Sequence, residues 1–316
     1  MKFSRFQYST VTLMIFSLLY FVYSLVILDS YNQGDRFVYA QVYQAISGLS
    51  FIGALVEYFW QLGATDIGWL LVYFPFSKIT NNLNIAQSII STLLFWHAGK
   101  FFYVRCNNIK FFIFYLNCYL NIQFLALSFS SLRLAIAFLF VFMAANSKRF
   151  KSFFFALISI ISHITILLVM YLNREKRYKL FLQLIMIVCG LAVLFIFWNV
   201  IGVFVLGKLN TYINSGISKL NIFGLFKLAI LLLFLILGAS EKRIFYIIPI
   251  IVIYLLIPDA RIYQLIYFTV YLRLTCVRSQ YSTVALIVLS FLGIPNGLKY
   301  IIGIFERGNG LDPLNF

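Results

Sequence analysis

Two short polar motifs interrupt long apolar stretches and carry groups suited to phosphate and proton chemistry. Ser-Ser-Leu-Arg at 130–133 opens one apolar run, and Ser162 and His163 lie inside another. A helix that the serines cap and that starts with Arg133 suits a phosphate, because backbone amides and a guanidinium both favour an anion. His163 could transfer a proton near neutral pH. The alternatives are an arginine that extends to the membrane interface and a packed, hydrogen-bonded histidine.

A third motif combines an acid, a base and aromatic hydroxyls. Tyr-Asn-Gln-Gly-Asp-Arg at 31–36 contains Asp35 and Arg36, and Tyr39 and Tyr43 follow at a spacing of four, which places them on one helical face. Such a set suits a sugar, which accepts hydrogen bonds and stacking on a ring face. The alternative is an aromatic helix at the membrane interface with a local ion pair.

Three further polar groups are candidates for substrate binding. Asp66 precedes Ile-Gly-Trp, where it could form a polar turn above a cavity or cap a helix. Arg261 follows Asp259 at the start of a later apolar run, as a phosphate ligand or half of a local ion pair. Lys208 lies in a loop and could attract an anionic lipid carrier or be simply solvated.

The elements that must position these groups are apolar helices. Of 316 residues, 63% are hydrophobic and 11% charged, whereas a soluble domain has about a quarter charged residues. The continuous apolar runs match the roughly 20 residues that cross a bilayer as a helix. We therefore predict an all-α, polytopic transmembrane helical bundle of about 10–11 segments, forming a single domain over 1–316. The predicted segments are 7–28, 61–77, 83–104, 110–128, 132–146, 151–173, 179–204, 222–239, 243–258, 261–274 and 282–303.

The positive charge of the chain predicts its orientation. The net charge is +16, and most Lys and Arg lie at the ends of apolar segments, which indicates membrane orientation and not nucleic-acid binding. This pattern places the N-terminus in the cytoplasm and 29–60 and 205–221 on the outer face. Two conflicts remain in the counting. One of 61–77 and 83–104, preferably the first, is re-entrant or interfacial. The run 151–173 either turns near His163 or breaks the charge rule.

Several familiar site types are missing from the sequence. It has no Asp-x-Asp pair, Walker A motif or zinc-protease motif, and its four cysteines are scattered without a CxxC pair. We therefore expect no metal and no cofactor.

In order and spacing the motifs resemble the EpsG-like family of bacterial polysaccharide polymerases, related in role to Wzy-type O-antigen polymerases. The resemblance rests on Gly-Asp-Arg at 34–36, Asp-Ile-Gly-Trp at 66–69, Leu-Arg-Leu-Ala-Ile-Ala at 132–137, Ile-Ser-His-Ile-Thr at 161–165 and Lys-Leu-Asn-Thr-Tyr at 208–212. At 65–68 the sequence departs from the Glu-Pro-Gly more usual in the family. The resemblance implies a multi-pass glycosyltransferase of the bacterial inner membrane. Such an enzyme polymerises undecaprenyl-diphosphate-linked oligosaccharide units at the periplasmic face, for lipopolysaccharide or capsule. A flippase and a chain-length regulator are possible partners.

Roles within such an enzyme follow from charge and proton transfer. We predict that Arg133 and Arg261 stabilise the departing diphosphate, with His163 as the first candidate base and Asp35 as the second. Metal-independent displacement without a carboxylate nucleophile would invert the anomeric configuration. A flippase or transporter of lipid-linked oligosaccharides is the main alternative, although no internal repeat is evident. A membrane acyltransferase and a structural scaffold are weaker alternatives.

Overall fold

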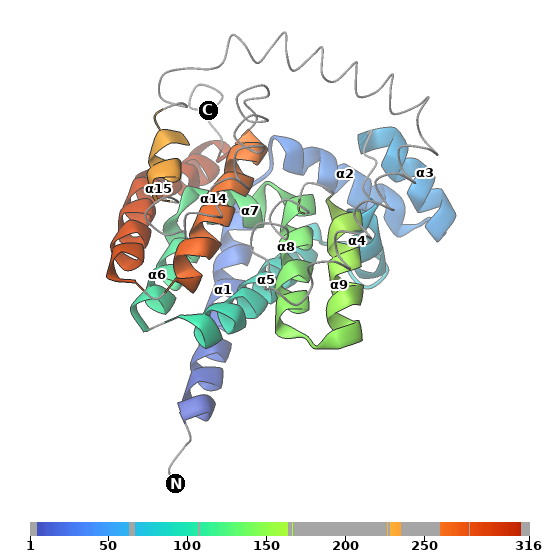
Figure 1. Ribbon diagram of the computed structural model, residues 1–316. Coiled ribbons are helices and arrows are strands. Elements are labelled where there is room, and N and C mark those ends of the chain that lie inside the picture. The colour runs from blue at the N-terminus through green and yellow to red at the C-terminus, as the bar shows by residue number, and fades with distance from the viewer. Residues whose placement is uncertain are drawn as a thin grey trace, which may run out of the picture. The chain divides into compact units, whose positions relative to one another are not determined.

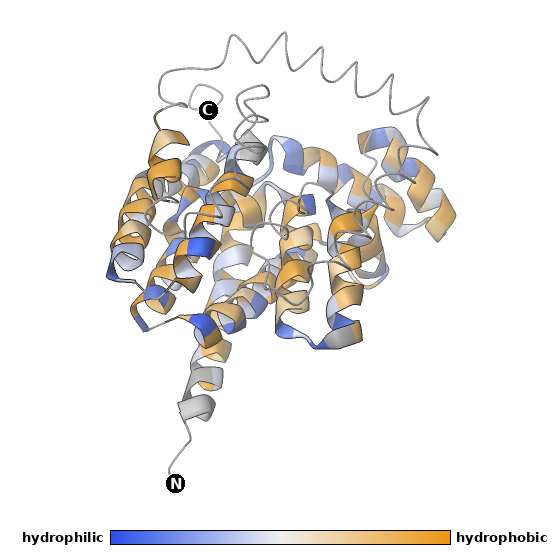
Figure 2. Cartoon of the chain, viewed as in Figure 1, coloured by the Kyte–Doolittle hydropathy of each residue, from blue (hydrophilic) through white to orange (hydrophobic). Residues whose placement is uncertain are grey.

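The computed structural model describes residues 5–62, 67–106, 108–163, 166, 226, 228–234, 260–277 and 279–310, and all regular structure within them is helical (Figure 1). Hydrophobic residues cover most of the helices, and many hydrophilic residues lie near helix ends (Figure 2). The chain forms two compact units, Met1–Leu167 with Thr283–Phe316, and Leu168–Ser282. The prediction of one domain over 1–316 stays a prediction.

The described helices of the first unit are α1 (Arg5–Ser30), α2 (Asp35–Ser47), α3 (Phe51–Leu62), α4 (Gly68–Ser77), α5 (Leu83–Arg105), α6 (Asn108–Leu120), α7 (Ile122–Phe129), α8 (Leu132–Asn146), α9 (Arg149–Ser162) and most of α15 (Gln280–Arg307). Helix α1 packs along α5, α5 along α8, and α8 along α9. The predicted segments 83–104 and 132–146 coincide closely with α5 and α8.

Helices α8 and α9 form an antiparallel hairpin, which is visible side by side in Figure 1. Near the connection, the Ser152 hydroxyl donates to the carbonyl oxygen of Ala144 at 2.8 Å. We call the end where α8 begins and α9 finishes the open end of this hairpin. Helix α9 stops at Ser162 and is followed by extended backbone at His163, so the predicted helix 151–173 does not continue through His163.

A sharp bend separates α6 from α7 inside the predicted segment 110–128, and the two helices together could still form one broken span. The two helices meet at 59° around Asn121, whose side-chain oxygen accepts from the backbone N–H of Gln123 and starts the new helix. Gly293 and Gly297 of α15 lie against this bend, because a Cβ at either position would collide with Asn121 or with the Leu120 backbone. The Gly-x-x-x-Gly spacing thus allows α15 close to the bend.

Helices α2 and α4 run parallel, since Tyr39 lies against Trp69 and, one turn on, Tyr43 lies against Tyr73. The ten residues of α4 span about 15 Å, roughly half of a bilayer core. This length agrees with the prediction that 61–77 is not a full transmembrane span.

Among the described helices, Thr10–Ser30 and Gln280–Arg307 are long and apolar enough to cross a membrane, and the bent pair α6–α7 could make a third span. The chain is thus a helical membrane bundle. In the second unit, α14 (Ala260–Cys276) matches the predicted segment 261–274. The predicted segments 179–204 and 243–258, most of 222–239 and the outer segment 205–221 lie outside the described residues.

Candidate functional site

The helical register of the α8–α9 hairpin brings the arginine motif and the histidine motif to the same level. The Ser159 hydroxyl donates to the carbonyl oxygen of Ala137 at 2.8 Å. One turn further toward the open end, the same register reaches Arg133 on α8 and His163 after α9. Both side chains are half-buried. A cation and an imidazole therefore lie at one end of a single hairpin.

The start of α4 lies at the same open end. A Cβ at Gly68 would collide with the backbone and hydroxyl of Ser162, so only glycine permits this approach. The segment that begins Ile67-Gly68 and the one that ends Ser162-His163 are far apart in the sequence, yet they meet here. The backbone of His163 is fixed on both sides, because its N–H donates to Ser159 at 3.1 Å and its carbonyl accepts from Ile166 at 3.0 Å.

An aromatic cluster holds the start of α4 in place. Trp69 is fully buried, with its ring centroid 5.6 Å from that of Tyr58 and 4.9 Å from that of Tyr73. Tyr39, predicted as a sugar-binding residue, is buried with its ring 5.3 Å from Trp69. Its position ties α2 to the helix that contacts Ser162.

Arg36, predicted to bind substrate, is the centre of a buried polar network. The side chain is 4% exposed, and it donates to the carbonyl oxygen of Leu28 at 2.6 Å, to the Gln87 amide oxygen at 3.3 Å and to the Asn84 amide oxygen. Burial lowers the pKa of Arg36 to about 10, so the guanidinium is still charged at neutral pH. A buried charge needs such acceptors.

This network fixes the turn that precedes α8. The Gln87 amide nitrogen donates to the carbonyl oxygens of Ser128 and Phe129, each at 3.1 Å. The Ser91 hydroxyl also donates to the Ser128 carbonyl, at 3.1 Å. The carbonyl groups at the end of α7 are therefore held by side chains of α5, one turn before Arg133.

A chain of hydroxyl groups links the same turn to Arg36. The Arg36 guanidinium lies 5.5 Å from the centre of the Tyr31 ring, and the Tyr31 hydroxyl shares a hydrogen bond with Ser130 at 3.1 Å. Ser130 is also hydrogen-bonded to Tyr300. Burial raises the pKa of Tyr31, which keeps its hydroxyl protonated. The serines do not cap α8 as predicted, since Ser131 stands at the N-cap without a side-chain capping bond.

The turn between α1 and α2 is tied to the end of α15. The backbone N–H groups of Asn32 and Gln33 donate to the carbonyl of Gly308, at 3.0 and 3.1 Å. Gly34 and Gly308 have φ of 69° and 68°, a conformation that favours glycine. This turn presents Asp35, the alternative base, as an exposed residue at the start of α2.

The remaining predicted residues are described less fully. Asp66 and Lys208 lie outside the described residues, and Arg261 is placed only as backbone in the first turn of α14. The sequence analysis missed Gln87 and Asn84, although polar side chains inside the apolar segment 83–104 were a usable signal.

Comparison with known proteins gives one family. A family model described as the EpsG family matches residues 13–305. No curated protein and no solved structure matches the chain.

Proposed function

The chain belongs to the EpsG family, which indicates a membrane-bound polysaccharide polymerase, and from that premise we propose that it joins lipid-linked oligosaccharide repeat units. The donor is an undecaprenyl-diphosphate-linked chain and the acceptor is the next lipid-linked unit. The reaction takes place at the periplasmic face of the bacterial inner membrane. The observation that carries this proposal is the shared level of Arg133 and His163 at the open end of the hairpin.

In this mechanism an acceptor hydroxyl attacks the anomeric carbon of the donor sugar, and the bond from that carbon to the diphosphate oxygen breaks. His163 takes the proton of the hydroxyl. Arg133 stabilises the negative charge that develops on the departing diphosphate, an effect typically worth about 3–4 kcal/mol for one well-placed donor. A single displacement inverts the anomeric configuration and needs no metal.

The other predicted residues have supporting roles in this proposal. Arg261 supplies a second cation for the diphosphate, and Lys208 attracts the anionic carrier. Asp35, exposed at the start of α2, is the alternative base. Asp66, which lies outside the described residues, contributes a polar group to substrate binding. Tyr39 and Arg36, both buried, act by shaping the substrate-binding end.

The direct test is polymerisation by the purified full-length protein in lipid nanodiscs. Lipid-linked repeat units from the host are added, and the products are separated on a gel. We expect a ladder of chain lengths that grows with time. If only the single repeat unit remains after prolonged incubation with active substrate, the proposal is wrong.

The phenotype of cells without the gene separates the polymerase from a flippase of the same lipids. Loss of a polymerase leaves single repeat units on the final acceptor, whereas loss of a flippase leaves none. A flippase partner and a chain-length regulator would be sought by co-purification with the tagged protein.

A further inference from the structure

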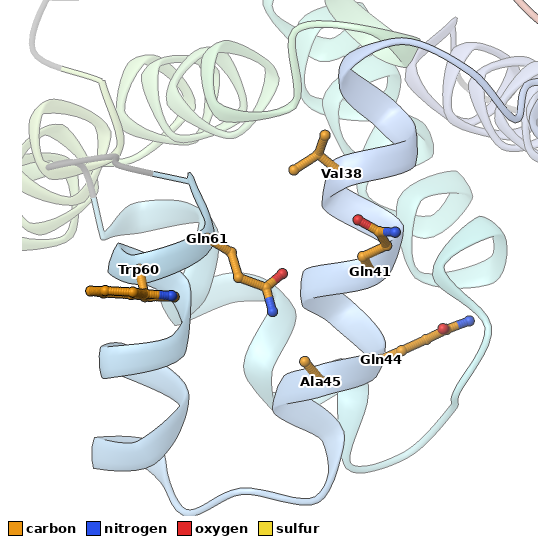
Figure 3. Close-up of a pocket in the computed structure, with 6 residues that line it drawn as sticks. All are labelled: Val38, Gln41, Gln44, Ala45, Trp60 and Gln61. Carbon is orange, nitrogen blue, oxygen red and sulfur yellow. The ribbon is translucent and has the colours of Figure 1, made fainter.

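A polar groove lies between α2 and α3, on the side of α2 away from its buried face. It has a volume of about 660 Å³ and opens to the surface. Its lining residues are Val38, Gln41, Gln44, Ala45, Trp60 and Gln61. In Figure 3, Gln61 extends from α3 toward α2, whose side of the groove includes Val38 and Gln41.

The chemistry of the lining excludes hydrocarbon as its natural occupant. Three of the six lining residues are glutamines, all exposed. An amide placed in hydrocarbon without a hydrogen-bond partner costs several kcal/mol, by a rough transfer estimate. The groove must therefore face water or a polar ligand.

The lining also argues against a charged ligand. It includes no Lys, Arg, Asp or Glu. Glu57, one turn before Gln61 on α3, accepts a hydrogen bond from the Gln61 amide nitrogen. Primary amides that both donate and accept suit the vicinal hydroxyl groups of a neutral sugar.

Trp60 adds the apolar component that such a ligand needs. Its side chain is 87% exposed, which leaves a large apolar ring surface at the groove. Aromatic residues with a polar edge are typical where an apolar surface meets water. Ile52 and Val56 continue an exposed apolar stripe along α3 toward Trp60. An exposed apolar stripe beside a polar groove is typical of the boundary between lipid and water.

Helix α2, which forms one wall of the groove, also packs against α4 beside the candidate site. On the opposite face of α2, Tyr39 packs on Trp69, and the Tyr43 hydroxyl donates to the carbonyl of Thr80 at 2.8 Å. Along α2, Gln41 lies roughly 9 Å from Asp35, given the helical rise per residue. An oligosaccharide that contacts Asp35 at the start of α2 could extend over this distance to the groove.

We propose that the α2–α3 groove binds the neutral oligosaccharide portion of the substrate, through the amides of Gln41 and Gln61 and the indole of Trp60. The inference rests on the proposed polymerase function and names a second contact region for its substrate, away from the reacting sugar.

The test measures glycan binding separately from catalysis. The probe is the reducing oligosaccharide that mild acid releases from the host's lipid-linked repeat units, and its binding to the full-length protein in nanodiscs is measured by calorimetry. The double variant Gln41→Ala/Gln61→Ala should weaken binding about ten-fold, because each amide contributes roughly one net hydrogen bond. It should also raise the KM for lipid-linked acceptor with little change in kcat. Gln280→Ala, an exposed glutamine outside the groove, is the matched control and should bind as the wild type does.

Trp60 provides an independent variant. Trp60→Ala should weaken binding, whereas Trp60→Phe, which keeps an aromatic face, should retain most of it. If the double variant fails to insert, the single variants Gln41→Ala and Gln61→Ala should each weaken binding about three-fold. Wild-type affinity in the glutamine variants and in Trp60→Ala overturns the inference.

The outcomes also separate this inference from the proposed function. If the wild type binds the oligosaccharide through these residues but forms no polymer, the polymerase proposal fails and the groove assignment holds. If the wild type forms polymer and the variants bind and polymerise as it does, the groove assignment alone fails.

Discussion

Arg36 and Arg133 each occupy the second position of a helix, yet the structure surrounds them differently. Arg36 is 4% exposed and donates to three acceptors within the protein. Arg133 is half-buried at the open end, level with His163. A guanidinium whose donors are used by neighbouring helices stabilises the architecture, while the partly exposed one at the start of α8 is the one that we propose acts on the substrate. Residue type and sequence position alone do not distinguish the two roles.

The substitution His163→Gln, at the open end of the hairpin, should have the largest effect on the rate of polymerisation. Removing a general base should lower the rate of polymerisation about 10²–10⁴-fold. A base must be unprotonated, so the wild-type rate should fall as the solution becomes acidic, and the variant should lack this fall. The measurement is the initial rate of polymer formation between about pH 5 and 8. His97→Gln, also a half-buried histidine, is the control and should keep the wild-type profile. A full rate and an unchanged pH profile in His163→Gln would exclude the base role.

The substitution Arg133→Ala tests the proposed diphosphate ligand at the same open end of the hairpin. Loss of one donor to the developing charge should lower kcat about 10²–10³-fold in protein that still inserts into the membrane. The control is Arg105→Ala. Arg105 is also half-buried, but it lies at the connected end of the hairpin, where it donates to the carbonyl of Ala145 at 3.5 Å. A normal ladder of chain lengths from Arg133→Ala would remove the arginine from the mechanism.

Arg36→Ala should affect stability first. It leaves the Leu28 carbonyl and the amide oxygens of Gln87 and Asn84 without their cationic donor, which we expect to cost roughly 3 kcal/mol of folding free energy. Thermal unfolding in detergent is the measurement. Arg36→Lys should restore only part of the loss, because a point charge cannot meet three spread acceptors. If Arg36→Ala kept its melting temperature but lost polymer, the roles assigned to the two arginines would be reversed.

The sequence predicted several elements well because continuous apolar runs mark them. Hydropathy alone placed 83–104 and 132–146 close to α5 and α8. It did not predict the 59° bend at Asn121, because both arms of the bend are apolar. The bend depends on Asn121 starting a new helix and on the glycines of α15 lying against it. The Gly-x-x-x-Gly spacing at 293–297 was a readable signal for this contact.

The candidate site was predictable in part. The sequence analysis selected Arg133 and His163 because ionisable groups within apolar membrane segments are energetically costly and usually functional. In the structure, the register of the hairpin places these two residues at one level. The buried environment of Arg36 was not predictable from its neighbours in sequence. Its acceptors, Asn84 and Gln87, come from α5, and only the packing of helices brings them to α2. The approach of Gly68 to Ser162 likewise depends on tertiary packing.

The smallest effect is predicted for Tyr31, which connects Arg36 with the turn before α8. Tyr31→Phe keeps the ring that faces Arg36 at 5.5 Å but removes the hydroxyl that bonds Ser130, at the turn before α8. We expect a loss of about 1 kcal/mol in stability and a several-fold lower rate of polymerisation, since the turn that presents Arg133 is held less firmly. Tyr23→Phe is the matched control, because its hydroxyl donates to the Tyr119 carbonyl at 2.5 Å, away from that turn. It should lose similar stability without losing rate. Equal rates for Tyr31→Phe and Tyr23→Phe would mean that the Arg36 network stabilises the fold without positioning Arg133, and that the two arginines act independently.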